Sequence, residues 1–433
     1  RGGRARWRPP ASNAPTCAGV AVRSVAVAAV FVLPISAEGQ RGPVAAYLST
    51  AGWASAAERV LGGAWIVCPS GTIDPAEARR IGSRPAPTGA AAVPGSRLRF
   101  VPAPVKTLAK DVRRNRQARA FHVDPAGPWA GADLEFVWQR HDLFQTAGLD
   151  LARALGRPSV LFAPATSVWE AERWGTHRPG WGGLAERLGE RPALTTADVV
   201  ACGAPEVAEQ ALRLGTDPER IVVTPTGVDL SLFDPPPDEA ERAAERERLG
   251  LADRFVVGWV GSFRPFHSLD RAVDAVAGLA DATLLLVGDG PERPAIEARA
   301  RERGVHLVCT GTVAHAELPR HLAAMDVGLV LGPADGAFHY SPLKLAEYLA
   351  AGLPVVAPSV GTVTARLTDG VDALLVDPGD PAALGAAVRA LRAEPALRRR
   401  LAAAGRAAAE AHWSWDEQVR RVVAALERLG RTR

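Results

Sequence analysis

The sequence lacks a long apolar run, a pattern of metal ligands and a strong net charge. No uninterrupted apolar run reaches the roughly 18 residues that a helix needs to span a bilayer. Lys and Arg number 51 against 47 Asp and Glu, so the overall charge does not favour a nucleic acid partner. No Asp-x-Asp pair and no cluster of His and Cys marks a metal site. The missing apolar run argues against a membrane span, and the charge balance argues against a nucleic acid partner.

Cysteine is also scarce. The four cysteines, Cys17, Cys68, Cys202 and Cys309, lie far apart and form no C-x-x-C pair. This spacing argues against a zinc ribbon and a redox motif. We therefore expect reduced thiols and a cytoplasmic location.

The start of the chain contains one segment without structural signals and one apolar run. Residues 1–22 are rich in Arg, Gly, Pro and Ala, and we expect them to be disordered. The run Ser24–Pro34 fits a buried strand or the apolar part of a signal peptide. Its many valines and its terminal proline favour the strand.

The length of 433 residues suits two domains rather than one core. Short apolar runs alternate with longer helical patterns, which is typical of parallel α/β units. The Pro- and charge-rich stretch 234–248 interrupts this alternation, and a fresh apolar run follows it. We predict a first domain at 23–235, a linker with a helix at 236–253 and a second domain at 254–410. A C-terminal helix at 411–433 can reach back to the first domain.

The alternation also predicts individual elements. Strands are expected in the first half at Trp65–Cys68, Phe136–Trp138, Ser159–Phe162, Val199–Cys202 and Ile221–Thr224. The second half is expected to hold strands at Phe255–Val260, Ala282–Val287, Val305–Cys309, Val327–Leu331 and Val355–Ala357, with helices between them. Such a doubly wound sheet binds its ligand at the carboxyl ends of its strands, near a topological switch point.

The most informative segment is His339–Pro358, with the sequence HYSPLKLAEYLAAGLPVVAP. Ser341 and Pro342 are typical of a helix start. Lys344 and Glu347 are three residues apart and therefore share a helix face. A helix start with a lysine suits a diphosphate, and a carboxylate one turn later suits a ribose diol. The same spacing also fits an ordinary surface ion pair.

A second candidate site follows the apolar run at 255–260, in the sequence GSFRPFHS. Gly261 and Ser262 allow a ligand to approach the backbone closely. Arg264 offers a planar guanidinium to phosphate oxygens, and His267 adds a donor. A polar turn with a surface arginine is the alternative.

A third segment, LLLVGDGPER at 284–293, is partly similar to a dinucleotide fingerprint. The third glycine of G-x-G-x-x-G is replaced by Arg293, and no acid follows at the expected distance. The segment therefore predicts a tight strand-to-helix turn and argues against a nicotinamide-dependent dehydrogenase.

In their order and spacing, these segments resemble family 4 of the retaining GT-B glycosyltransferases over about residues 135–430. The family's glycine-rich turn with Arg is matched by Gly261 and Arg264, and the Glu that binds the donor ribose is matched by Glu347. The S-P-x-K-L run of one family branch is matched by Ser341, Pro342, Lys344 and Leu345.

Several positions depart from the family pattern. His339 stands at the first Glu of the family's E-x7-E motif, and Ala365 stands at an acid of a later loop. Thr226 replaces an Asn in the interdomain stretch, and Pro164 replaces a His or Asn of the first domain. The two missing acids leave an altered donor preference or a degenerate site open.

The resemblance implies an α/β fold of two Rossmann-like, doubly wound domains that face a cleft. It implies sugar transfer from a nucleotide-sugar donor with retention of configuration, without a metal or another cofactor. The groups that would stabilise the departing diphosphate or bind the nucleotide are Arg264, Lys344 and Glu347. The further donor contacts are Gly261, Ser262, His267, His339, Ser341 and Leu345. A sugar-nucleotide epimerase of the same fold and an inert nucleotide-sugar-binding protein remain alternatives.

The first domain would hold the acceptor, which is a glycan, a lipid or a small molecule. Arg140 and His141 follow a predicted strand, and Glu170 matches a family acid, so these three are the candidate acceptor contacts. The helical stretch Lys106–Arg119 has six Lys or Arg and one Asp. A solvated helix face explains it best, and at most we expect a weak peripheral contact with the inner membrane face.

Overall fold

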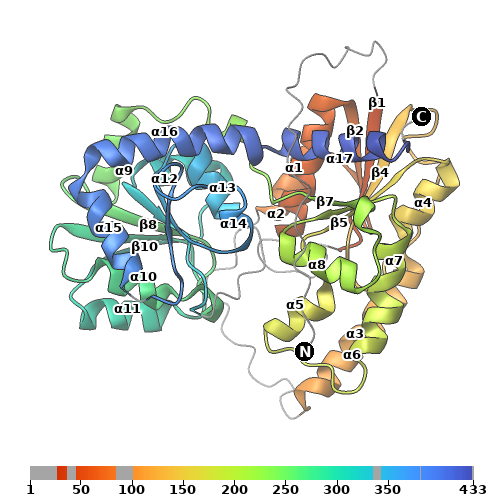
Figure 1. Cartoon of the computed structure of the whole chain (residues 1–433), viewed down its shortest axis with the longest axis horizontal. Coiled ribbons are helices and arrows are strands. Elements are labelled where there is room, and N and C mark those ends of the chain that lie inside the picture. The colour runs from red at the N-terminus through yellow and green to blue at the C-terminus, as the bar shows by residue number, and fades with distance from the viewer. Residues whose placement is uncertain (1–26, 37–44, 84–100, 335–342, 381, 432–433) are drawn as a thin grey trace.

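The computed structural model describes residues 27–36, 45–83, 101–334, 343–380 and 382–431. The predicted N-terminal disordered segment, 1–22, lies outside these ranges. The described chain forms two lobes, each built around a largely parallel sheet with helices on its faces (Figure 1). The α/β prediction of two doubly wound sheets is confirmed.

The first sheet has the strand order β3-β2-β1-β4-β5-β6-β7, and only β3 runs antiparallel to its neighbour. Its strands are β1 Val27–Val32, β2 Gly62–Cys68, β3 Gly71–Ile73, β4 Leu134–Arg140, β5 Ser159–Ala163, β6 Val199–Cys202 and β7 Ile221–Val223. Its helices are α1 Ala45–Val60, α2 Pro75–Gly82, α3 Ala103–Ala120, α4 Ala147–Leu155, α5 Ser167–Arg173, α6 Gly182–Ala185, the π-helix η2 Glu186–Glu190, α7 Arg191–Thr196 and α8 Pro205–Arg213.

The second sheet has the order β10-β9-β8-β11-β12-β13 and is entirely parallel. Its strands are β8 Phe255–Val260, β9 Ala282–Val287, β10 His306–Gly311, β11 Val327–Leu329, β12 Val355–Pro358 and β13 Leu374–Val376. Its helices are α9 Glu239–Arg248, α10 Leu269–Val276, α11 Arg293–Glu302, α12 Leu318–Ala323, α13 Leu343–Ala350, α14 Gly361–Thr364, α15 Ala383–Ala393 and α16 Pro395–His412. The last helix, α17 Trp415–Arg428, crosses back to the first lobe.

The apolar run near the start of the chain is a strand. All six residues of β1 are buried, and β1 pairs with β2 on one side and β4 on the other. The order of the strands reverses at this position, between β1 and β4, and again between β8 and β11 in the second sheet. Loops at the carboxyl ends of these strands are therefore the expected ligand sites.

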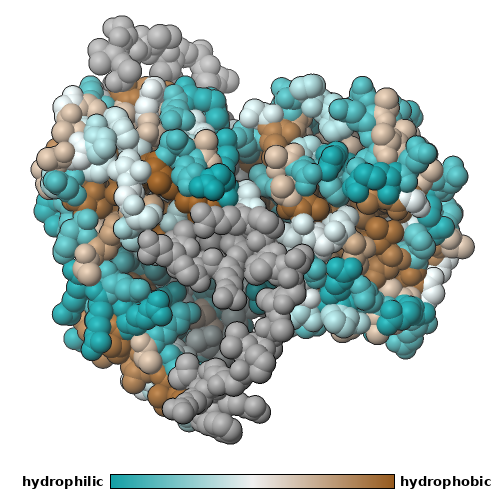
Figure 2. Space-filling view, turned by 180° about the vertical axis from the view of Figure 1, so that it is seen from behind, coloured by the Kyte–Doolittle hydropathy of each residue, from teal (hydrophilic) through white to brown (hydrophobic). Residues whose placement is uncertain are grey.

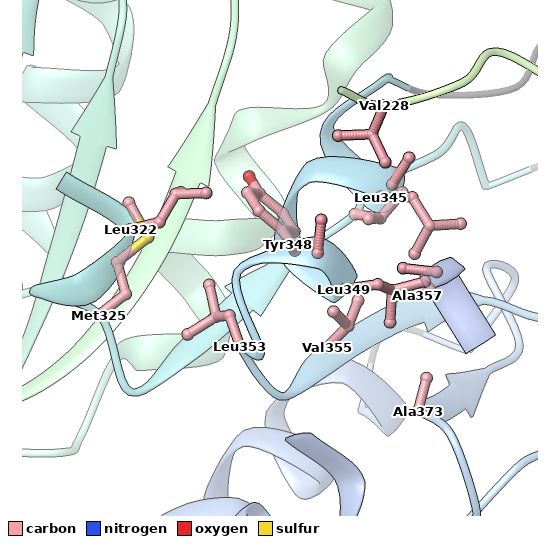
Figure 3. Close-up of a cluster of buried hydrophobic side chains, with 14 of the residues drawn as sticks. Val228, Leu322, Met325, Leu345, Tyr348, Leu349, Leu353, Val355, Ala357 and Ala373 are labelled. Carbon is pink, nitrogen blue, oxygen red and sulfur yellow. The ribbon is translucent and has the colours of Figure 1, made fainter. Parts of the chain in front are cut away.

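Each sheet is covered by apolar side chains on its helices. In the first lobe, aromatic rings join α1 to the sheet, since Trp53 lies 5.9 Å from Trp138 and 5.5 Å from Phe162 between ring centroids. In the second lobe, α13 supplies Leu345, Tyr348 and Leu349 to a buried cluster with Met325 and Val355 (Figure 3). The two cores thus fix the positions of α1 and α13.

Two segments connect the lobes, and they are hydrogen-bonded to each other. Val228 N donates to Trp413 O over 2.7 Å, and Trp415 N donates to Val228 O over 3.3 Å. The indole of Trp415 is packed between Gly52 of α1 and Gly227 of the first crossing. A Cβ atom at Gly52 would lie 2.2 Å from Trp415 Nε1, and one at Gly227 would lie 2.5 Å from Trp415 Cδ2. The close approach of the indole requires glycine at both positions.

We predict that Gly52→Ala destabilises the protein by about 1–3 kcal/mol, because the added methyl group has to displace the Trp415 ring. Gly183→Ala is the matched control, since a Cβ atom there has no neighbour within 4 Å and alanine favours a helix. Denaturant unfolding of both variants measures the difference. Equal stability of the two variants would show that the ring moves away at no cost.

Candidate active site

A cavity of about 200 Å³ lies between the two lobes, and both lobes contribute to its walls. The first lobe supplies Ser49, Arg79 and Arg140. The second lobe supplies His315, Leu343 and Glu347. The crossing segments supply Thr226, Gly227, Val228, Asp229 and Trp415. The cavity therefore lies where the carboxyl ends of both sheets face each other.

Helix α13 carries the charged residues of the second lobe into this region. Its apolar residues, among them Leu345, are fully buried against the sheet. The hydroxyl oxygen of Tyr348 accepts a hydrogen bond of 2.8 Å from Val260 N, at the last residue of β8. This bond fixes α13 to the strand that precedes the Gly261 turn. Leu345 thus supports the helix from the core and does not line the cavity.

Lys344 lies under the Gly261 turn. Its Nζ atom is 4.1 Å from the centroid of the Trp259 ring, and a Cβ atom at Gly261 would lie 3.3 Å from it. Gly261 has φ +143°, a value that side chains disfavour, so glycine keeps the turn open above the ammonium group. Loss of hydration lowers the pKa of Lys344 to about 7, and the charge of Glu347 only partly offsets this.

Glu347 is buried and pairs with a histidine that the sequence motifs did not include. His315 Nε2 donates to Glu347 Oε1 over 2.8 Å, and both residues line the cavity. Burial alone lowers the pKa of His315, but the hydrogen bond to Glu347 and the charge of its carboxylate raise it above the usual 6.5. His315 follows β10, so its place at a carboxyl strand end was the signal that could have identified it.

The side chains of the turn after β8 lie in two different surroundings. His267 packs against the edge of Trp259, with ring centroids 5.2 Å apart. Burial, with the nearby charges of Lys344 and Arg264, lowers the pKa of His267 to about 3, so its ring is neutral at physiological pH. Ser262 and Arg264 are exposed, and Arg264 lines a separate cavity with residues of α10 and α11. The structure brings Gly261, His267 and Lys344 together next to the interlobe cavity, whose lining does not include them. The Arg264 side chain lies at the separate cavity.

The three acceptor-side candidates also lie in different surroundings. Arg140 lines the interlobe cavity, donates to Ser49 Oγ over 3.0 Å and lies over the Phe162 ring. Burial lowers the pKa of Arg140 to about 10, although the charge of Glu170 opposes this. Burial raises the pKa of Glu170 against the opposing charge of Arg140. Arg140 is thus the candidate whose guanidinium reaches the cavity.

His141 is completely buried and pairs with a carboxylate of the first lobe. Its Nε2 atom lies 3.2 Å from Glu190 Oε1, which also accepts from Ser167 N at the start of α5. This pair joins β4, η2 and α5. The geometry therefore assigns His141 a structural place away from the cavity.

Some predicted contacts lie outside the described residues, and some cavity residues were not predicted. His339 and Ser341 fall in the segment 335–342 and are not described. Arg79 and Asp229 line the cavity as an ion pair, and Arg79 also donates to Ser55 Oγ. Sequence spacing gives no sign of this pair, because its members come from distant segments.

Within the ranges that the structure describes, no group of three or more His, Cys, Asp or Glu side chains is arranged to hold a metal ion. Among the same residues, no helix combines the length and the apolar character needed to cross a bilayer.

Known families and relatives identify the chain. The model described as Glycosyltransferase Family 4 matches residues 64–232, and the model described as Glycosyl transferases group 1 matches residues 254–394. The D-inositol 3-phosphate glycosyltransferase of Xylanimonas cellulosilytica is 35% identical over 336 residues, which cover 69% of this chain and 79% of that protein. The chain belongs to glycosyltransferase family 4.

Other similarities of this family 4 glycosyltransferase cover shorter stretches or only the fold. The GDP-mannose-dependent alpha-(1-6)-phosphatidylinositol monomannoside mannosyltransferase of Mycolicibacterium smegmatis is 34% identical over 47% of this chain and 55% of that protein. The chain thus spans about half the length of that relative. The structure of Anabaena HepE in complex with UDP is 16% identical, with a TM-score of 0.64 over 93% of this chain and 100% of that one. Sucrose-phosphate synthase from Thermosynechococcus elongatus, at 20% identity, has a TM-score of 0.63 over 93% of this chain and 99% of that one.

These similarities confirm the family, the GT-B fold and the enzyme class that the motifs predicted. The roles of the individual site residues stay predictions.

We predict that the pKa of His315 depends on Glu347. In the parent enzyme, His315 should titrate above its usual 6.5, and Glu347→Gln should move the value below 6.5, because burial then acts without the opposing carboxylate. The raised pKa also means that the pair stabilises the folded state fully below about pH 6.5 and loses this contribution as pH rises through the folded-state value. NMR titration of the histidine ring protons, assigned with His315→Gln, measures both pKa values. An unchanged pKa in Glu347→Gln would contradict the pairing.

Proposed function

We propose that this family 4 glycosyltransferase transfers a sugar from a nucleotide-diphosphate sugar to a hydroxyl of an acceptor held by the first lobe, with retention of configuration. The observation that carries the proposal is the placement of Lys344 and Glu347 one helical turn apart, beside the Gly261 turn and the interlobe cavity. The two residues offer a cation to a diphosphate and hydrogen-bond acceptors to a ribose.

Lys344 is suited to stabilise the departing diphosphate. Its ammonium lies against an aromatic ring rather than a carboxylate, and the described residues form no hydrogen bond or ion pair with it. A phosphate group at the Gly261 turn would meet a poorly hydrated cation, whose attraction is stronger than in water. Negative charge grows on the diphosphate as the sugar bond breaks, so the contact would favour the transition state.

Glu347 is suited to hold the nucleoside. A carboxylate that faces the cavity accepts hydrogen bonds from two neighbouring hydroxyls, and His315 fixes its orientation from one side. The mannosyltransferase relative is named as GDP-mannose-dependent, and Anabaena HepE has been solved with UDP and with UDP-glucose. These names support a nucleotide-sugar donor, while the base and the sugar stay open.

Arg140 is our candidate for contact with the acceptor. Its guanidinium lies on the first-lobe wall of the cavity, opposite Glu347 and His315. A polar acceptor in the cavity would therefore meet a cation on one side and the donor site on the other. We also keep metal independence and a cytoplasmic location as parts of the proposal.

Lys344→Ala should lower kcat/KM by roughly tenfold to a hundredfold, equivalent to about 1.5–3 kcal/mol, because a charge-assisted contact is lost. Glu347→Ala should weaken nucleotide binding by a similar factor, and Glu347→Gln should be milder because one acceptor remains. Asp150→Ala is the control, since it removes an exposed ion pair with Arg153 and should leave activity intact. Donor turnover in the presence of EDTA is the assay.

The outcomes of this assay separate the candidate functions. Folded alanine variants with parental activity would overturn the donor site. Donor interconversion without transfer would indicate an epimerase, and nucleotide binding without turnover would indicate an inert binding protein.

Nucleotide binding should also be coupled to proton uptake by Lys344. Burial holds the pKa of Lys344 at about 7, and a bound diphosphate should raise it. At pH 7.5, calorimetric titration with UDP or GDP in buffers of different ionisation enthalpy should report proton uptake. Lys344→Arg keeps a permanent charge and should bind with much less uptake. Equal uptake by both proteins would assign the proton to another group.

A further inference from the structure

The exposed apolar side chains of this enzyme are concentrated at one corner. Among the described residues, the large apolar side chains that stay exposed are Val105 (52%), Leu108 (45%), Val112 (45%), Trp174 (38%), Leu184 (54%), Leu188 (56%) and Val371 (50%). Five of these seven lie on α3, α6 and η2 of the first lobe. We call these five residues, Val105, Leu108, Val112, Leu184 and Leu188, the apolar corner. Exposed apolar groups that gather in this way mark an interaction surface, whereas scattered ones do not.

Helix α3 presents its apolar residues as a stripe. Val105, Leu108 and Val112 are spaced by three and four residues, so they line one side of the helix. The exposed basic residues of the same helix are Lys106, Lys110, Arg113, Arg116 and Arg119. The helix therefore combines a narrow apolar stripe with a strongly positive surface.

The single acid of α3 does not offset this charge at the surface. Asp111 is buried, and both of its carboxylate oxygens accept from Arg178, over 2.7 and 3.0 Å. Trp181 Nε1 donates to the same carboxylate over 3.2 Å. These bonds hold α3 against the segment that leads into α6, so the two parts of the apolar corner are fixed side by side (Figure 1).

The apolar corner adjoins the acceptor side of the first lobe. Arg114 and Gln117 of α3 line a cavity of about 270 Å³ together with Pro34 and Asp142, which follow β1 and β4. Helix α3 thus borders the carboxyl edge of the first sheet. Seen from behind, apolar side chains are visible at the lower left of the molecule, where the first lobe carries α3 (Figure 2).

We infer that the apolar corner docks on the surface of an anionic lipid bilayer. Leucine and valine side chains enter the boundary between headgroups and acyl chains, while lysine and arginine extend to the lipid phosphates. Each basic residue near an anionic surface adds to the attraction. This inference does not depend on the donor chemistry, because none of its residues lines the interlobe cavity.

The charge of α3 argues against a second copy of the chain as the occupant. A symmetric dimer through this corner would place the five exposed cations of one α3 against those of the other. The repulsion between these like charges would oppose the free energy gained by burying the small apolar area. An anionic lipid surface complements both features at once.

Vesicle flotation of the full chain tests the inference. The protein should bind vesicles of phosphatidylcholine with phosphatidylglycerol, bind phosphatidylcholine alone much more weakly, and lose binding as salt is raised. Leu108→Asp and Leu188→Asp should each lower the partition coefficient by roughly tenfold, because each removes one inserted side chain and adds a repelled charge.

Val371→Asp is the matched control, because Val371 is equally exposed but lies in the second lobe. It should bind vesicles like the parent, and all variants should keep the circular dichroism spectrum and donor binding of the parent. The inference is overturned if the parent ignores anionic vesicles or if Val371→Asp loses as much binding as Leu108→Asp. It is also overturned if ultracentrifugation shows a parent dimer that Leu108→Asp dissociates, since the corner would then join two copies.

Discussion

The hydrogen bond between Val260 N and the hydroxyl of Tyr348 joins α13 to the end of β8, just before the Gly261 turn. It satisfies the backbone N–H of the last residue of β8 with a side chain from α13, so the strand end and the helix are held together at this point. Because Lys344 precedes Tyr348 by four residues and Glu347 is its neighbour, the same bond sets the position of both charged groups. The apolar face of α13 fills the second core, whereas Glu347 lines the cavity and Lys344 lies against Trp259 beside it.

The charges around the cavity are balanced unevenly. Glu347 is matched by His315, and Asp229 is matched by Arg79. Lys344 and Arg140 have no such carboxylate partner within the described residues, and burial lowers the pKa of each. Poorly hydrated cations of this kind bind anions more strongly than solvated ones. Each lobe of the enzyme therefore carries one such cation.

The sequence predicted the parts of this enzyme that depend on local patterns. The alternation of apolar runs identified five of the six strands of the second sheet and missed β13. Helix signals located α13 with Lys344 and Glu347 on one face. Contacts between distant segments were not predictable in this way. The pair of His315 and Glu347 needs the packing of η6, His315–Glu317, against α13, and the separation of Arg264 from the cavity depends on how one turn bends. Leu345 matched a motif, yet its face of the helix makes it a core residue.

Helix α17 follows the second lobe in the sequence but packs in the core of the first lobe. Trp415, Val419 and Val422 pack among the side chains of α1 and the first sheet. On the ribosome, the first lobe is therefore synthesised long before its last core residues emerge. The second lobe can complete its own core earlier, so the order of synthesis and the order of completion are opposite for the two lobes. A chaperone that protects exposed apolar surface would be needed longest by the half that is made first.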